Sequence, residues 1–354
     1  MSKEKIMKKP QFSQSQKAIT ALRKTWMTNV LFSTGIALLV MIVLQTFALG
    51  FEFGSFSEWF SVWLSNWINI LRNNAGIGII SLGMTLVIIS GGIDLAVGST
   101  LVAIGAVLMM LIDSGPKGIL QNWGIVGVPA FIIAIVIAVL CGLILGQLTG
   151  LLVTKGKLPP FIATLGTMQI FRSVTQHFMQ GYTPVVPKPF LAIASLQIGG
   201  KLLMPILYWV ILAVVFYIIS TRTAFGRQVI AVGSNERASK LSGIDINKVK
   251  RRVYAIMGLL VSVAAVIQIS RIGSMDYANA GSGYEMDAIS AVIVGGTSMA
   301  GGKGTIIGTV LGTLIIAVMN NLLNLIGVPP FLREAFKGVI VIGAVLLQKK
   351  ESNS

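Results

Sequence analysis

Apolar runs separated by short polar stretches cover most of the chain between residues 26 and 347. A helix needs about 20 apolar residues to cross a bilayer, and shorter halves suffice where glycine interrupts it. The pattern therefore predicts an all-α, polytopic integral membrane protein. Its ten predicted segments are Trp26–Leu49, Ala75–Ser90, Ala96–Ile112, Val128–Val153, Phe161–Met179, Leu203–Ser220, Val253–Ile272, Met286–Val294, Thr305–Ile326 and Phe331–Leu347. The eighth is short, so it either spans the membrane or re-enters it.

One glycine-rich break interrupts the long apolar stretch 75–112. It contains Gly91, Gly92, Asp94 and Gly98. A carboxylate and irregular backbone persist at membrane depth only where protein or a water-filled cavity shelters them. We therefore interpret these four residues as a structural helix break. We also expect the Asp94 carboxylate to accept backbone N–H groups at the start of the next helix.

The break has a similar sequence later in the chain. Ile89–Gly98 aligns without gaps with Ile293–Gly302, and five of the ten positions are identical. Both copies stand between apolar segments, as in a duplicated transporter half. Coincidence among the many Gly, Ala and Ile residues is the alternative, and the sequence leaves both open.

Two predicted helices carry glycines at a spacing of four residues. Such glycines form a flat ridge on one helix face, which allows a neighbouring helix to approach closely. The ridges consist of Gly142, Gly146 and Gly150 in one helix and of Gly304, Gly308 and Gly312 in the other.

Basic residues lie mostly in alternate loops. With a cytoplasmic N-terminus, twenty of the 28 Lys and Arg residues fall on the inside. This bias predicts that both termini are cytoplasmic and that the number of spans is even. The chain then divides into a basic N-terminal segment (1–25), a transmembrane domain (26–348) with a cytoplasmic loop (221–252), and a C-terminal tail (349–354).

Composition excludes several function classes. Hydrophobic residues make up 54% of the chain, charged residues make up 11%, and the mean hydropathy is +0.83, which excludes a soluble domain. The net charge of +16 does not predict nucleic-acid binding, because the basic clusters lack interleaved aromatic residues.

Catalytic and metal-binding constellations are also missing from the sequence. A single histidine and a single cysteine cannot form a multi-His or multi-Cys metal site, and no hydrolase motif occurs. The segment Thr297–Gly304 lacks two defining residues of a phosphate-binding loop, so we expect a sharp turn there. No catalytic residue and no metal ligand is predicted, and the chain is not expected to be an enzyme.

The longest polar interior segment contains a short capped helix between Gly233 and Gly243. Asn235 is a good N-cap, Glu236 favours the positive helix end, and Gly243 suits the left-handed position after the helix. A helix of about two turns does not persist alone in water, so the segment either docks on a partner or is a solvated loop.

Two groups of polar residues in apolar segments are candidates for a substrate pathway. Amide and hydroxyl groups beside apolar walls suit a hydroxylated solute. Hydrogen bonding between helices, without any ligand, is the alternative for each of them. The candidates are Thr164, Thr167 and Gln169 in the fifth segment and Asn320 and Asn321 in the ninth.

From about Leu82 to the C-terminus, the chain resembles the permease subunits of bacterial ABC importers for simple sugars, the ribose and galactose group. The motifs that carry the resemblance are Gly83–Gly98, Pro160–Met168, Gly233–Gly243, Gly283–Ile289, Val294–Thr297 and Gly301–Gly304. Within that group, Asn320–Val328 is similar to ribose-type members, whereas Leu165–Met168 is also similar to galactoside-type members.

The resemblance implies a multi-pass protein of the bacterial cytoplasmic (inner) membrane that pairs with a second permease copy, as a homodimer or with a related permease. An extracytoplasmic binding protein would deliver the sugar. A separate ATP-binding subunit would hold ATP-Mg, and this chain would bind no cofactor. The residues implied to couple to that subunit are Gly233, Asn235, Glu236, Ala238, Leu241 and Gly243.

A different class of transporter fits part of the sequence. An ion-coupled secondary transporter would use the carboxylate of Asp94, and ion-driven uptake without an ATPase would distinguish it. A membrane enzyme is a third hypothesis, but it lacks a recognisable catalytic constellation.

Overall fold

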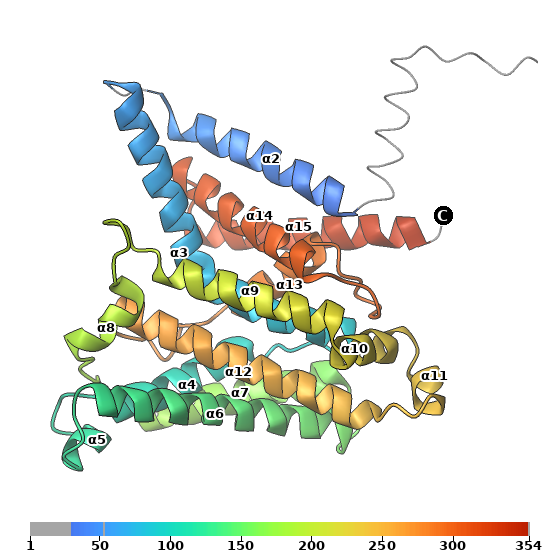
Figure 1. Cartoon of the computed structure of the whole chain (residues 1–354), viewed down its shortest axis with the longest axis horizontal. Helices are drawn as coiled ribbons and strands as arrows, with labels where there is room; N and C mark the ends of the chain where they lie inside the picture. The colour runs from blue at the N-terminus through green and yellow to red at the C-terminus, as the bar shows by residue number, and fades with distance from the viewer. Residues whose placement is uncertain (1–29, 52–53, 353–354) are drawn as a thin grey trace, which may run out of the picture.

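The computed structural model describes residues 30–51 and 54–352, which form a bundle of helices (Figure 1). In chain order they are α2 (Val30–Leu49), α3 (Phe56–Ile89), α4 (Val97–Ile112), α5 (Ile119–Asn122), α6 (Val128–Thr154), α7 (Pro160–Met179), α8 (Lys188–Ser195), α9 (Met204–Arg222), α10 (Ala224–Ser234), α11 (Glu236–Leu241), α12 (Ile246–Ile272), α13 (Tyr284–Val294), α14 (Ile306–Leu325) and α15 (Pro330–Ser352). Among the described residues, the only β-type pairing is an isolated bridge between Ile198 and Lys201, in the loop between α8 and α9. The all-α prediction is confirmed.

Some predictions fall on residues outside this description. The basic segment 1–25, the first four residues of the segment predicted to start at Trp26, and the last two residues of the tail all lie there. The three-part division of the chain stays a prediction.

Six of the described helices are both long enough and apolar enough to cross a membrane. These are α2, α3, α6, α9, α12 and α14. Each of the ten predicted segments contains a helix, but α4 has 16 residues and α13 only 11. The prediction of about ten spans is therefore confirmed only as far as a multi-pass helical protein.

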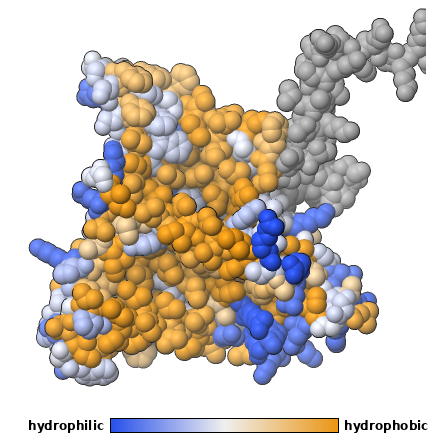
Figure 2. Space-filling view, in the orientation of Figure 1, coloured by the Kyte–Doolittle hydropathy of each residue, from blue (hydrophilic) through white to orange (hydrophobic). Residues whose placement is uncertain are grey.

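The long helices lie side by side, with α12 packed against α6, α3 and α4, and with α14 packed against α13, α2 and α3. Figure 2 shows an apolar surface over the middle of these helices. Hydrophilic residues gather at the end where α10, α11 and the start of α12 lie. An apolar belt with a polar end is the surface expected of a membrane-embedded bundle.

Two helices begin well before their apolar segments. Helix α3 starts at Phe56 instead of Ala75, and the Ser55 side chain accepts a hydrogen bond from Glu58 N. Helix α12 starts at Ile246 instead of Val253, and the Asp245 carboxylate accepts one from Lys248 N. The predicted starts were wrong because the caps and helical periodicity extend beyond the hydrophobic stretches.

The predicted glycine ridge on α6 is confirmed. A side chain at Gly142 or Gly146 would collide with main-chain atoms of α12, at Gly258 and Tyr254 respectively. In the second ridge, Gly308 and Gly312 of α14 contact α13 in the same way, whereas Gly304 precedes the helix. Small residues thus allow two pairs of helices to pack backbone against backbone.

Two passages through the bundle are only half helical. In the first, an irregular segment follows Ile89 at the end of α3 and leads into α4. In the second, an irregular segment begins at Gly273 after α12 and leads into α13. Their helical halves begin close together, since a side chain at Gly98 would collide with the carbonyl oxygen of Gly281. A helix break is therefore present at residues 90–96 and includes Gly91, Gly92 and Asp94, whereas Gly98, predicted as part of it, lies in the first turn of α4. A second break precedes α13.

The two similar decapeptides lie against each other, and Gly302 N donates to Ile89 O at 2.8 Å. The first connects α3 to α4, whereas the second follows α13 and forms the turn before α14. Their surroundings therefore differ, and an internal repeat is not confirmed.

Candidate functional site

The segment Gly233–Gly243 folds as its sequence predicts. Asn235 ends α10 and begins α11, and its Oδ1 accepts a hydrogen bond from Ala238 N at 2.9 Å. Glu236 lies in the first turn and pairs with Lys250 Nζ of α12. Gly243 follows the helix with a φ of +80°, the left-handed conformation that favours glycine. The result is a short helix fixed at both ends.

Helix α11 presents an apolar side chain at its tip. Leu241 is 90% exposed, whereas Ser239 on the other face of the helix is buried. A single exposed leucine is common on protein surfaces, but this one lies on a helix of only six residues at the polar end of the bundle. That placement suits a partner that covers the leucine.

Next to α11, Gly233 of α10 lies against two glycine-rich loops. One is the break that follows Ile89, and the other is the turn before α14 that contains Gly302. A side chain at Gly233 would collide with the carbonyl oxygen of Ile89 and crowd Gly302 N. Likewise, a Cβ at Gly302, whose φ is +72°, would meet Ser234. We call this meeting of Gly233, Ile89 and Gly302 the glycine junction. The α10–α11 corner is therefore in close contact with both loops.

The helix break holds its carboxylate next to the start of α4. Asp94 is 6% exposed, and its Oδ1 accepts a hydrogen bond from Ala96 N at 2.9 Å. Tyr254 of α12 donates to the Ile93 carbonyl at 3.1 Å and lies close to Gly92. The carboxylate thus bonds the residue that precedes α4, but the expected cap of the helix is not present, since the N-cap residue is Ala96 and no side-chain cap hydrogen bond is formed.

The turn predicted at Thr297–Gly304 is also present. Ser298 N donates to Lys303 O at 2.9 Å, and Gly301 N donates to Ser298 O at 3.0 Å. The loop connects α13 to α14 and touches the glycine junction through Gly301 and Gly302.

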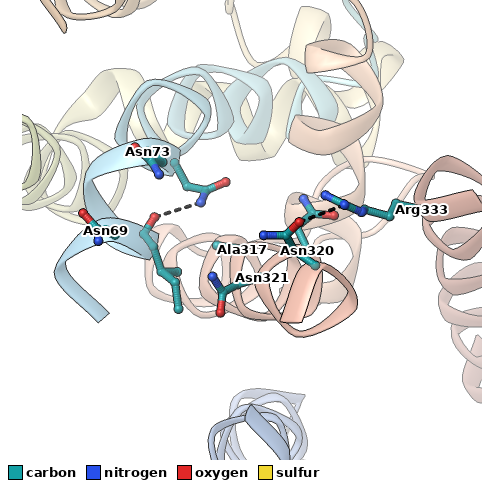
Figure 3. A pocket seen from close by; sticks show the side chains of 9 residues that line it. Asn69, Asn73, Ala317, Asn320, Asn321 and Arg333 are labelled. Carbon is teal, nitrogen blue, oxygen red and sulfur yellow. Dashed lines mark hydrogen bonds between the residues drawn. The ribbon is translucent and has the colours of Figure 1, made fainter. Parts of the chain in front are cut away.

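The candidate pathway residues of the fifth segment do not meet those of the ninth. Thr164 and Thr167 are buried on α7, and their hydroxyls donate to carbonyls of the same helix. Gln169 is exposed. Asn320 and Asn321 instead line a cavity between α3, α14 and α15 (Figure 3).

Sequence reasoning gave no role to a buried charge pair. Asp287 of α13 and Lys337 of α15 are 7% and 10% exposed and lie 2.8 Å apart, and Lys337 also contacts Glu334 at 2.9 Å. Charged residues within apolar segments are the signal that points to such pairs. The sequence does not show that these two residues meet.

Arg172 of α7 bridges the second irregular passage. Its Nη1 donates to the carbonyl oxygens of Tyr277 and Ala280 at 3.2 Å and 2.7 Å. The arginine thereby satisfies carbonyls that a continuous helix would have satisfied internally. Among the described residues, no cluster of His, Cys, Asp or Glu could hold a metal ion.

Helices with irregular halves, tight glycine contacts and a capped helix at the polar end are compatible with the membrane-embedded subunit of a transport system. The chain belongs to the family described as branched-chain amino acid transport system / permease component, which matches residues 66–345. The predicted membership of the ABC permeases is confirmed, and with it the prediction that this is a transport subunit and not an enzyme.

Several named relatives match most of the chain. It is 40% identical over 295 residues to the ribose import permease protein RbsC of Bacillus subtilis (strain 168). The aligned region covers 81% of this chain and 85% of the relative. It is 36% identical to the probable ABC transporter permease protein YphD of Escherichia coli (strain K12), covering 79% and 80%. It is 33% identical to the galactose/methyl galactoside import permease protein MglC of the same strain, covering 80% and 85%. No solved structure matches the chain.

Proposed function

We propose that this chain is the membrane-spanning subunit of an ATP-driven importer that moves a monosaccharide into the cytoplasm. Ribose or a similar pentose or hexose is the substrate we expect. Relatives named as ribose import permeases are about 40% identical to it, and the galactoside permease is 33% identical. The observation that carries the coupling part of the proposal is the glycine junction behind α11.

The proposal assigns energy and substrate delivery to partners. A separate ATP-binding subunit would hold ATP-Mg and receive α11 in a cleft, with Leu241 covered by the contact. An extracytoplasmic binding protein would deliver the sugar to the other end of the bundle. A second permease copy, identical or related, would complete the membrane part.

The proposed topology has ten crossings. Six of these crossings are the long, apolar helices named above. The other four are α7, α15 and the two half-helical passages that contain α4 and α13. Helix α11 and the described end of α15 lie at the same end of the bundle in Figure 1. With the basic loop 221–252, this supports cytoplasmic termini in a bacterial inner membrane.

The coupling step we propose is a rigid-body change between inward-open and outward-open states. Closure of the ATP-binding subunits would move α11, and Gly233 would transmit the displacement to Ile89 and Gly302. Helix α4 begins a few residues beyond Ile89 and α14 begins a few residues beyond Gly302, so both helices would move with these contacts. Thr164, Thr167, Gln169, Asn320 and Asn321 remain the proposed pathway residues.

The docking of α11 is tested by Leu241→Arg in the assembled importer. A charged residue in the covered contact should reduce ATPase association and ATP-driven ribose uptake by about tenfold or more, the loss typical of a central interface residue. Leu196→Arg is the matched control, because Leu196 is also exposed (56%) but follows α8 at the opposite end. Equal uptake by both variants would refute the docking role of α11.

A further inference from the structure

A polar stripe follows the first half of α3. Ser61, Ser65, Asn69 and Asn73 recur at every fourth residue, so they share one face of the helix. Polar groups on a membrane helix persist where they face protein or a water-filled space. The stripe therefore marks the side of α3 that is not covered by lipid.

Helix α14 presents amides to the same space. Figure 3 labels Asn69 and Asn73 on α3 and Asn320 and Asn321 on α14, all four of which line the cavity. The cavity volume is about 200 Å³, below the roughly 300–1,000 Å³ of sites for drug-sized ligands, so the cavity suits only a small solute. Its lining consists of Asn69, Ile70, Asn73, Asn74, Ala317, Asn320, Asn321, Asn324 and Arg333.

A second hollow continues the first along α3. It shares Asn69 and is also lined by Leu49, Ser61, Val62, Ser65 and Asn66. Asn66 Nδ2 of α3 donates to Asn321 Oδ1 of α14 at 3.4 Å, and Asn321 Nδ2 donates to Asn66 Oδ1 at 3.3 Å. These two hydrogen bonds join the helices that line the hollows. We call the two connected hollows the asparagine groove.

The charged groups at the groove are already engaged by the protein. Arg333 donates to Asn324 Oδ1 and to the Val328 carbonyl, both at 2.9 Å. Arg271 donates to Asn73 Oδ1 at 2.6 Å. No Asp or Glu lines either hollow. The groove thus offers a ligand mainly neutral amides.

Amides and hydroxyls are matched partners, because each can both donate and accept hydrogen bonds. Asn320 Oδ1 is shielded from solvent and has no hydrogen-bond partner among the described residues, so it is an unpaired acceptor that a hydroxyl would satisfy once the cavity admits one. Ile70 and Ala317 supply apolar wall beside these amides. Such a combination suits the mixed polar and C–H surface of a sugar.

We propose that the asparagine groove binds a neutral, polyhydroxylated solute. The inference rests on the proposed function, since a groove at this place would be a station on the path of the imported monosaccharide. It adds Asn69, Asn73 and Asn74 of α3 to the two asparagines expected from the sequence.

The test measures protection of an introduced thiol. Ser61→Cys and, separately, Ser65→Cys place a thiol in the groove without removing one of its amides. Both are made with Cys141→Ser, and the full permease is studied with its ATP-binding partner in lipid nanodiscs. The rate of labelling by a small water-soluble thiol reagent is measured alone, with ribose or galactose, and with inorganic phosphate. Asn122→Cys is the matched control, because Asn122 is an exposed residue at the end of α5 and does not line the groove.

We expect either sugar at about ten times its dissociation constant to slow labelling of at least one groove cysteine about tenfold, because only the unoccupied fraction reacts. Phosphate should not protect, and the control rate should not change. Absence of sugar protection at both cysteines, or protection by phosphate alone, would overturn the proposal.

Uptake by the unmodified importer separates this inference from the proposed function. Ribose or galactose uptake that needs ATP, together with unprotected groove cysteines, would refute only the groove. Protection by a sugar in a particle that transports neither sugar would refute the importer role and retain the site.

Discussion

The proposed coupling depends on the absence of a side chain at Gly233. The main chain at the α10–α11 corner approaches the Ile89 carbonyl so closely that no Cβ fits between them. The same close approach occurs at Gly302 against Ser234. Glycine at these positions is required by contact between backbones.

Gly233→Ala should therefore separate α11 from the loops that it contacts. We expect ATP-driven uptake to fall by about tenfold, with 1–3 kcal/mol of strain at the junction. The readouts are uptake in proteoliposomes and helix content by circular dichroism. Gly35→Ala is the control, because a Cβ on Gly35 of α2 meets nothing within 4 Å. Uptake equal to that of the control would show that the junction does not couple.

Asp94 distinguishes a structural role from a charge-specific one. Asparagine can accept the same hydrogen bond from Ala96 N, whereas leucine cannot. Asp94→Asn should retain transport, and Asp94→Leu should lose about 1 kcal/mol of stability together with much of its uptake. Thermal unfolding and uptake of both variants measure this. If Asp94→Asn loses as much transport as Asp94→Leu, the charge itself is needed.

Asp113 connects two loops beyond the end of α4. Its Oδ2 accepts a hydrogen bond from Tyr182 at 2.6 Å, and its Oδ1 accepts the main-chain N–H groups of Gly115 and Val185, both at 2.8 Å. Burial opposes ionisation of the carboxyl, but these bonds outweigh it and hold the pKa of Asp113 below its ordinary value.

A lowered pKa means that Asp113 stabilises the fold above its unfolded pKa of about 4, and that this stability is lost as the pH falls through the folded pKa. The thermal midpoint should therefore drop on acidification below about pH 4. Asp113→Asn should lose about 1 kcal/mol at pH 7 and show less of that acid dependence. An unchanged midpoint at pH 7, with the same acid profile as the unmodified protein, would contradict this role.

At the scale of helices, the apolar pattern located every long element but not its full length. It missed the start of α3 because Arg72, Asn73 and Asn74 interrupt the hydropathy without interrupting the helix. The glycine ridge on α6 and the cap of α11 were predictable, since each depends on residues close together in sequence. Local rules of spacing and capping therefore account for these features.

Features that join distant segments were not predictable from the sequence. The half-helical passage before α13 depends on Arg172, which lies on α7, more than one hundred residues away. Similarly, the face-to-face placement of Asn69 and Asn320 follows from how α3 packs on α14. Tertiary packing, which a single sequence does not reveal, determines both.

Lys337 and Asp287 hold α15 against the short helix α13. Removing one partner leaves a buried charge without compensation, which costs about 3–5 kcal/mol. Lys337→Met should therefore destabilise the protein by an amount of that order, measured as loss of folded protein on heating. The double variant Asp287→Asn/Lys337→Met should recover much of the loss. If it is no more stable than Lys337→Met alone, the pair does not act as a unit.

For the whole molecule, three features follow one another along the bundle. Helix α11 lies at the polar end, the glycine junction lies directly behind it, and two half-helices begin together between the ends. Family membership places this arrangement among the permease components of transport systems. The central claim is that ATP hydrolysed by a partner drives sugar through it.

The most direct test is ribose uptake into proteoliposomes that contain this permease with its ATP-binding subunit, supplied with a loaded binding protein outside. The account predicts uptake that requires ATP in the compartment of the ATP-binding subunit and continues after ionophores collapse all ion gradients. Uptake driven by an ion gradient in vesicles that contain the permease without the ATP-binding subunit would contradict it.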